Sequence, residues 1–127
     1  MLREEHRAII RQLDRVHRLL DDKKHLLGRE SIDALGAQLK VHLAHEEEAL
    51  YRPLKSILKE RSPTGELMKD HRSIRRALRE LEGLAAASGG QASASDLRGQ
   101  LQILQSALRE HMVKEEKVAY WLADHHL

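Results

Sequence analysis

The stretch LKVHLAHEEEALYRPL, residues 39–54, combines the leucine spacing of a helix with two histidines and three consecutive glutamates. Leu39, His42 and Glu46 follow steps of three and four residues, so a helix places them on one face. A run of charges on a helix is ordinarily a solvated face. An unpaired, ionised glutamate in an apolar core costs several kcal/mol. The stretch therefore predicts a helix whose buried face carries polar groups that need a partner.

This stretch has a counterpart near the end of the chain. VHLAHEEEALY, starting at Val41, aligns with EHMVKEEKVAY, starting at Glu110, at an offset of 69 residues. EHRAIIRQLDRV, starting at Glu5, aligns with DHRSIRRALREL, starting at Asp70, at an offset of 65. The difference fits a loop insertion between the third and fourth helices. The repeat predicts two helical hairpins, each with one histidine on its first helix and His-x-x-x-Glu on its second.

Helical periodicity extends over most of the chain. The predicted helices span residues 2–26, 30–60, 65–87 and 95–123. The clearest break is Ser62-Pro63-Thr64-Gly65, and SGGQASAS, residues 88–95, predicts a flexible connection. Asp96, or a serine just before it, is the expected N-cap of the fourth helix. Short connections between four amphipathic helices predict an all-α, antiparallel, up-down-up-down four-helix bundle as a single domain, residues 1–127.

The composition narrows the classes of function. A length of 127 residues suits one domain, and the profile of 41% hydrophobic and 33% charged residues without Phe suits a helical bundle. The net charge of +2, with basic and acidic residues interleaved, argues against nucleic acid. No apolar run approaches the roughly 18 residues of a membrane span. The charged N-terminus does not look like a signal peptide, so we expect a cytoplasmic protein.

Histidine, with nine residues, is the unusual part of the composition, whereas cysteine is absent. Each predicted helix directs at least one histidine along its apolar stripe. The repeat-related residues on these stripes are His6, His42, Glu46, His71, His111 and Glu115. Two metal ions would offset the cost of burying two carboxylates, each ion taking two imidazoles with the glutamates bridging or lying between the ions. Ligation by imidazole and carboxylate without sulfur suits iron or manganese and is compatible with zinc.

The four segments REEHRAI, HLAHEEEALYRPL, KDHRSIRRAL and LREHMVKEE resemble the helix signatures of the hemerythrin-like family, the HHE cation-binding domains. The resemblance covers nearly the whole chain. It implies a bundle that holds a non-heme di-iron centre, which meets dioxygen, peroxide or nitric oxide. By position, the family's ligands correspond to the six residues named above.

Two positions depart from the pattern of the oxygen-carrying members. Those proteins have a second histidine four residues after that on the third helix, where this chain has Arg75. They also use an aspartate five residues after the last histidine, where this chain has Glu116, although Glu115 faces the core better. The lower histidine count argues against reversible oxygen carriage. It leaves either an open coordination position or a fifth imidazole from elsewhere.

Three further residues are candidates for an additional ligand or for a hydrogen bond to a ligand. His17 shares a face with His6 three turns away, but its repeat equivalent is Glu82, so the repeat favours His6. Tyr51 and Tyr120 are repeat-related, which fits hydrogen bonding to the site. Packing in the core with an exposed hydroxyl is the alternative for both tyrosines.

The helical spacing also makes predictions about the residues around the site. It continues the buried face through Ala49 and Pro53 on the second helix and through Val118 and Leu122 on the fourth. The residues expected at the surface are His45, Glu47 and Glu48. In antiparallel hairpins, His71 and His111 lie level with each other. His42 and His71 are offset by about a turn, which a bend near Pro53 would absorb.

The sequence leaves the chemistry at this site open. Dioxygen binding, sensing, nitric oxide handling and peroxide breakdown all fit a di-iron centre, and they include both enzymatic and non-enzymatic roles. The alternatives are an iron storage or delivery protein, a structural bundle held together by zinc, and a metal-free interaction module. We expect no nucleic acid and no membrane among the partners, and the sequence identifies no partner protein.

Overall fold

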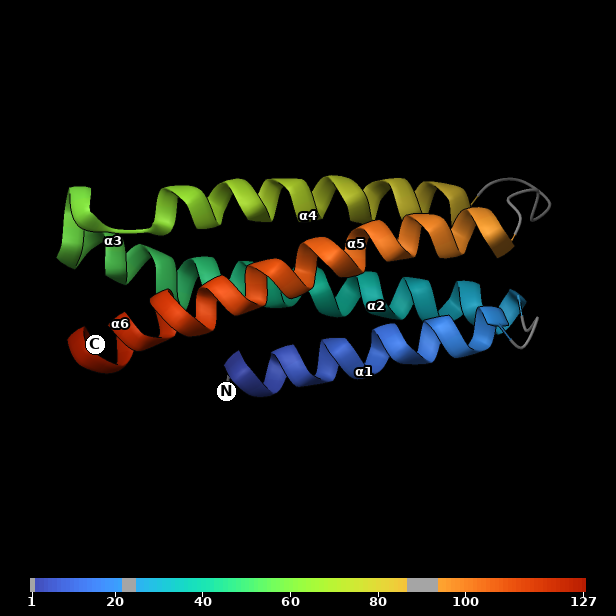
Figure 1. Ribbon diagram of the computed structural model, residues 1–127, viewed down its shortest axis with the longest axis horizontal. Helices are drawn as coiled ribbons and strands as arrows, with labels where there is room; N and C mark the ends of the chain where they lie inside the picture. Colours follow the sequence, from blue (N-terminus) through green and yellow to red (C-terminus); the bar gives the residue numbers. More distant parts are fainter. Residues whose placement is uncertain (1, 22–24, 87–93) are drawn as a thin grey trace.

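The computed structural model describes residues 2–21, 25–86 and 94–127. These residues form helices only. The elements are α1 (Leu2–Asp21), α2 (His25–Glu46), the π-helical turn η1 (Glu47–Tyr51), α3 (Arg52–Leu58), the 3-10 turn η2 (Lys59–Arg61), α4 (Thr64–Ala85), α5 (Ala94–Lys114), the π-helical turn η4 (Glu115–Ala119) and α6 (Tyr120–His126). Because η1 joins α2 to α3 and η4 joins α5 to α6 without a break, the described residues form four long helices. They form the predicted up-down-up-down bundle (Figure 1).

The leucine stripes of the four helices meet in one core. Within each hairpin α1 packs on α2 and α4 on α5, while α2 with α4 and α1 with α5 close the bundle. The fully buried residues include Ile9, Leu13, Leu20, Ile32, Leu35, Leu39, Ile74, Leu78, Leu81, Leu97, Leu101 and Leu104. A second cluster at the far end joins η1, α3, α4, η4 and α6. Figure 1 shows α3 and α6 extending beyond the start of α1. The metal-binding candidates lie between the two clusters, and both sides hold them in place.

The predicted boundary between the first two helices is wrong. α1 ends at Asp21 and not near residue 26, and α2 begins at His25 and not near residue 30, with Gly28 buried inside it. A Cβ atom on Gly28 would lie 2.8 Å from Cδ2 of Leu20, so the glycine permits close packing on α1 and does not break the helix. The fourth long helix begins at Ala94, close to the predicted start, which puts Ser95 and Asp96 inside the first turn, so neither is the N-cap. The other serine, Ser93, lies outside the described residues. Most of the predicted 88–95 connection lies outside the described residues.

The two π-helical turns change which residues face the core. In each turn a backbone N–H bonds to the carbonyl five residues earlier: Arg52 to Glu47, and Tyr120 to Glu115. The wider turn rotates the following residues, so Val118 is 42% exposed and Ala49 is also exposed. The predicted extension of the buried face through these two positions is wrong.

The inward-facing residues at the end of the π turns are instead Leu50, Tyr51, Ala119 and Tyr120. The position equivalent to Pro53 in the repeat is Leu122, and the two π turns are nevertheless alike. The proline is therefore not the cause of the distortion near it. Since π turns often occur at functional sites, their presence on both site helices is informative.

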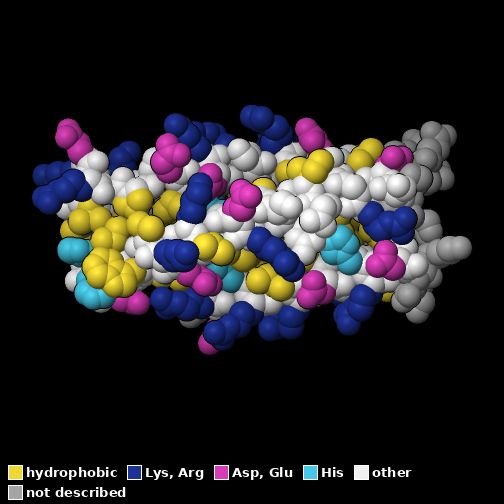
Figure 2. Space-filling model, viewed as in Figure 1, with side chains coloured by type: hydrophobic (Ala, Val, Ile, Leu, Met, Phe, Trp, Pro, Cys, Tyr) yellow, Lys and Arg dark blue, Asp and Glu magenta, His cyan; other side chains and the backbone are white. Residues whose placement is uncertain are grey.

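The surface carries charges of both signs. Figure 2 shows Lys and Arg side chains spread along one face with Asp and Glu between them, and hydrophobic side chains gathered at the end occupied by α6. At that end Trp121 is 54% exposed, and its ring stacks on His125 with the centroids 4.1 Å apart. Among the described helices, none is long and apolar enough to cross a membrane.

Candidate metal centre

The six residues that the sequence proposes as ligands lie together in the bundle. His6 comes from α1, His42 and Glu46 from α2, and His71 from α4. His111 comes from α5, and Glu115 is the first residue of η4. None of the six is more than 3% exposed, and both glutamates are fully buried. Each side chain lies on the apolar stripe of its helix, so the same periodicity that builds the core brings the six together.

The six residues form two groups of four that share both glutamates. One group adds His6 and His42 to Glu46 and Glu115, and the other adds His71 and His111. In each group, one ligand atom per residue can be chosen so that all four atoms lie within 4.8 Å of one another. We call these groups the His6 half and the His71 half. The imidazole rings are 4.8 Å apart in the His6 half and 4.7 Å apart in the His71 half, measured between centroids.

Each glutamate reaches the imidazoles of both halves. Oε1 of Glu46 lies 3.2 Å from Nε2 of His42 and 3.1 Å from Nε2 of His71. Oε1 of Glu115 lies 3.2 Å from Nε2 of His6 and 3.1 Å from Nε2 of His111. The two carboxylates therefore have the position of bridges between two adjacent cation sites.

A second set of carboxylates holds the outer nitrogens of the same four rings. Nδ1 of His42 donates to Glu5 at 2.7 Å, and Nδ1 of His71 donates to Glu47 at 2.6 Å. Nδ1 of His111 donates to Asp70 at 2.9 Å, and Nδ1 of His6 lies 3.5 Å from Glu116. A carboxylate can only accept, so each Nδ1 carries a proton, and Nε2 is the ring atom that can bind a cation at the centre. Outer partners of this kind fix the orientation of metal-binding imidazoles.

The sequence reasoning missed these outer carboxylates, and for Glu47 it was wrong. Glu47 was expected at the surface, but its carboxylate bonds to His71 and pairs with Arg75 at 2.8 Å. Glu48 is 64% exposed, as expected. The internal repeat could have identified these carboxylates, because they occupy equivalent positions in the two hairpins. Glu5 aligns with Asp70, and Glu47 aligns with Glu116.

Three outer carboxylates also bind a basic side chain nearer the surface. Glu5 bonds to His45 at 2.8 Å, and Asp70 pairs with Lys114 at 3.0 Å. His45, expected at the surface, is partly buried by this contact. Arg75 occupies the position of the fifth histidine of oxygen carriers, and its guanidinium turns to Glu47. Among the described residues no fifth imidazole joins the two groups.

The two tyrosines complete the inner surface of the site, one for each half. The Tyr120 hydroxyl donates to Oε2 of Glu46 at 3.1 Å and lies 3.0 Å from Nε2 of His6. The Tyr51 hydroxyl donates to Glu115. It also lies 3.0 Å from Nε2 of His71 and 3.1 Å from Nε2 of His111. Both hydroxyls face the ligands and not the solvent, so packing with an exposed hydroxyl is excluded.

His17 lies away from the site. Its Nε2 accepts a hydrogen bond of 2.7 Å from the side-chain amide of Gln105, whose oxygen in turn accepts from Arg109 at 2.8 Å. Three helical turns separate His17 from His6 along α1, and the structure places it in neither group of four. The structure gives His17 a role in the contact between α1 and α5.

The charges of the site shift the pKa values of its imidazoles. Burial alone would lower the pKa of His6, but hydrogen bonds to Glu115 and Glu46 and their negative charges outweigh it and raise the pKa to about 9. Burial likewise opposes the shifts at His42 and His111, whose pKa values are raised by Glu46 and Glu115 respectively. Without a metal, the site therefore attracts protons onto these rings.

The same surroundings lower the pKa of Glu46 and raise the pKa values of the two tyrosines. Burial would raise the pKa of Glu46, but hydrogen bonds from three imidazoles hold it well below its usual range. Burial, together with the charges of Glu46 and Glu115, raises the pKa values of Tyr51 and Tyr120 far above the ordinary value. Protons on neighbouring rings, together with the Tyr120 hydroxyl, offset the charge of Glu46, a role that a cation can take over.

Two buried atoms show that the residues fit a cation. Nε2 of His42 and Oε1 of Glu115 are fully enclosed, and their contacts of 3.1–3.2 Å with the neighbouring imidazoles and carboxylate lack hydrogen-bond geometry in the described residues. An unsatisfied buried polar atom costs about 1–3 kcal/mol. Both atoms face the centre of the cluster, and both are chemically suited to bind a metal. The donor set of four imidazoles and two carboxylates fits a pair of ions.

Comparison with protein families agrees with this geometry. A family model described as the hemerythrin HHE cation binding domain matches residues 1–123. The chain belongs to the hemerythrin HHE cation-binding domain family. Comparison with curated protein sequences and with solved structures gives no significant match. As a hemerythrin HHE domain, the bundle has a buried His/Glu cluster that can hold a metal, at the positions where the sequence predicted ligands.

Proposed function

We propose that this hemerythrin HHE domain is a non-heme di-iron protein that binds or reacts with a small molecule such as dioxygen, nitric oxide or peroxide. The observation that supports it best is the sharing of two buried glutamates by two pairs of imidazoles. One pair, His6 with His42, would hold the first ion, and His71 with His111 the second. Glu46 and Glu115 would lie between the ions.

Iron bound here would supply redox chemistry with diatomic molecules and peroxide. The chain's own residues set the conditions for it. Outer carboxylates keep the Nδ1 protons in place, so the Nε2 lone pairs point inward. The hydroxyls of Tyr51 and Tyr120 are protonated donors inside the site. Leucines and isoleucines of all four long helices form the core beside the site and exclude water there.

The ligand count supports reactivity over simple carriage. Each half offers two imidazoles and shared carboxylate oxygens, and Arg75 bonds to Glu47 where oxygen carriers have another imidazole. Iron is commonly six-coordinate, so two imidazoles and two carboxylate oxygens leave positions for an exogenous molecule. The same donor set also suits zinc. Zinc at this site would stabilise the fold and would give neither colour nor redox activity.

The test is reconstitution with ferrous iron under argon, followed by stopped-flow mixing with dioxygen, peroxide and nitric oxide. We expect a visible band in the oxidised protein that changes with azide, and a reaction with at least one of the three molecules. A colourless protein that takes up zinc in preference to iron, or an iron protein inert to all three, would contradict the proposal. Rapid release of iron to a weak chelator would indicate storage or delivery.

A further inference from the structure

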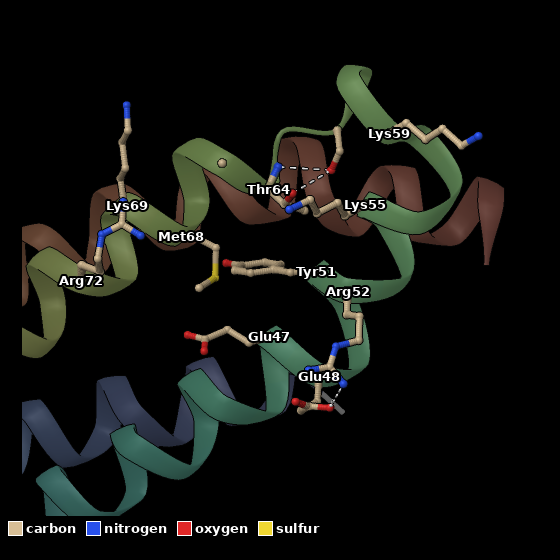
Figure 3. Close-up of a pocket in the computed structure, with 12 residues that line it drawn as sticks. Glu47, Glu48, Tyr51, Arg52, Lys55, Lys59, Thr64, Met68, Lys69 and Arg72 are labelled. Atoms are coloured by element: carbon tan, nitrogen blue, oxygen red, sulfur yellow. Dashed lines mark hydrogen bonds and ion pairs between the residues drawn. The ribbon is translucent and has the colours of Figure 1, made fainter.

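A cleft of about 700 Å³ opens beside the metal centre, between the segment η1–η2 and the start of α4. Figure 3 shows Tyr51 and Met68 between the helix that carries Lys55 and the helix that carries Arg72. Tyr51 is only 3% exposed, and its hydroxyl points away from the cleft to the ligands of the His71 half. One ring therefore separates the cleft from the candidate metal centre.

Basic side chains dominate the lining of this cleft. They are Arg52, Lys55, Lys59, Lys69 and Arg72, against the two carboxylates Glu47 and Glu48. Neither carboxylate pairs with Lys55, Lys59, Lys69 or Arg72. Glu47 bonds inward to His71 at 2.6 Å, and Glu48 pairs with Arg52 at 3.0 Å.

The remaining cations are arranged as like-charged neighbours. Lys69 and Arg72 are three residues apart on α4, a spacing at which like charges repel, and Lys59 follows directly after the end of α3, which carries Lys55. Lys69 has a distant contact with Glu66 at 3.4 Å. In the described part of the chain, no carboxylate pairs with the other three. The fold gains nothing from this clustering, whereas a bound anion would be stabilised by it.

The other half of the molecule provides an internal control. A smaller cleft of about 240 Å³ lies over Tyr120, lined by apolar residues of α1, η1 and α6. Its one arginine, Arg3, lies 5.0 Å from the centre of the Tyr120 ring and pairs with Asp124 at 3.4 Å. By the repeat, Asp124 corresponds to Lys55. The bundle architecture therefore does not require a basic residue at this position.

We propose that the basic cleft over Tyr51 binds a small organic anion that carries a phosphate or carboxylate group. Three features select this class of ligand. The cations supply the charge, and the first turn of α4, with Thr64 and Gly65 in the lining, adds the positive end of a helix. Tyr51 and Met68 offer an apolar floor for the body of the ligand. The volume lies in the range of sites for small organic molecules and exceeds what a bare inorganic anion fills.

This inference goes beyond the proposed function and does not depend on a bound metal. An anion in the cleft would sit across the Tyr51 ring from His71 and His111, and no comparable anion would face the His6 half. The cleft would then distinguish the two halves by charge.

Nuclear magnetic resonance titration with phenyl phosphate tests the proposal, with benzoate, inorganic phosphate and uncharged benzyl alcohol as further arms. We expect saturable shifts of amide signals in residues 51–72 with phenyl phosphate or benzoate. Whichever of the two binds more tightly identifies the headgroup. Inorganic phosphate should bind more weakly and benzyl alcohol least of all. The titrations are run on metal-loaded and metal-free protein, so that failure of the metal proposal leaves this result interpretable.

Substitution of the basic residues provides the decisive comparison. Lys55→Gln with Arg72→Gln should weaken binding of the organic anion at least tenfold, as should Lys59→Gln with Lys69→Gln to a lesser degree. Arg79→Gln, which removes an exposed charge two turns further along α4, should leave binding within twofold. No saturable shift with either organic anion, equal binding of benzyl alcohol, or unchanged affinity in both double variants would overturn the proposal.

Discussion

The two halves of the candidate metal centre are built from the same parts but differ in their surroundings. Each has two imidazoles, both shared glutamates and one tyrosine. The outer carboxylate of His71 lies 2.6 Å from its ring and also binds Arg75, whereas that of His6 lies 3.5 Å away and is 50% exposed. The cleft over Tyr51 is basic, and the one over Tyr120 is mostly apolar. The repeat preserves the metal ligands and lets their environment diverge.

This difference distinguishes the candidate ligands from the residues around them. The imidazoles and glutamates that would bind a cation directly recur in both halves. Surroundings that differ, such as the distance of the outer carboxylate from its ring and the presence of Arg75, would set how firmly a ring is held and what approaches it. Asymmetric surroundings would make the two ions of a pair unequal, so that one of them meets an exogenous molecule first.

The largest expected effect is the loss of bound iron when both histidines of one half are replaced. His6→Ala with His42→Ala should reduce the bound iron from two ions per chain to one, because both imidazoles of that half are lost. His71→Ala with His111→Ala should do the same for the other half. Metal analysis after reconstitution measures both.

A double variant outside the site serves as the control for these losses. His17→Ala with His125→Ala also removes two imidazoles, but neither belongs to a group of four, and it should keep both ions. Full iron content in either test variant would exclude that pair of histidines as ligands.

The outer carboxylates should have unequal effects on metal affinity. Glu47→Gln should weaken binding by about 10–100-fold, the range for outer partners of metal-binding histidines. Glu116→Gln should cost only a fewfold, because its contact with His6 is long and half-exposed. Competition with a chromophoric chelator measures both affinities. Equal losses in the two variants would show that the distances do not govern the strength of the two halves.

The tyrosines should stabilise the metal-free protein by different amounts. Tyr51→Phe removes a hydroxyl that contacts two imidazoles and Glu115, so it should lower the free energy of unfolding by about 1–2 kcal/mol. Tyr120→Phe removes contacts with one imidazole and one carboxylate and should cost about half as much. Urea denaturation measures the difference. No loss in either variant would mean that the rings act by packing alone.

The smallest effect concerns a helical glycine away from the site. A Cβ on Gly36 would lie 2.5 Å from Oε2 of Glu82, which would have to leave its ion pair with Lys40. By the repeat, Gly36 and Glu82 correspond to Gln105 and His17 in the other half. Gly99→Ala, where the added atom meets nothing, should stabilise the protein by roughly 0.5–1 kcal/mol. Gly36→Ala should stabilise the protein less. Equal stabilisation by the two substitutions, measured by thermal unfolding, would show that the added methyl group does not conflict with Glu82.

Helical periodicity was sufficient to predict the fold and to place the six residues on the inner faces of the four helices. It failed where the helix itself changes. In η1 and η4 the backbone winds more widely than a regular helix, so the predicted inward positions Ala49 and Val118 face solvent. No residue type marks a π turn, and a count of threes and fours cannot register one.

The outer carboxylates were hidden for a different reason. A charged residue next to a ligand in sequence lies roughly 100° away around the helix, which is the direction of the surface. Only the neighbouring helix decides whether it meets solvent or an imidazole, as for Glu47 and His71. Similarly, the boundary at His25 depends on how closely Gly28 packs on Leu20, a contact between helices. The basic cleft, too, combines segments on both sides of the Ser62–Gly65 break.

The iron content of Glu46→Ala with Glu115→Ala tests the central claim most directly. Both carboxylates belong to both halves, so their removal should abolish the pair and not one ion of it. We predict two iron ions per chain in the reconstituted wild type and none held tightly in the double variant, measured beside Glu48→Ala, whose exposed carboxylate lies outside the site. A wild type that binds no metal, or a double variant with unchanged metal content, would contradict the shared di-metal centre.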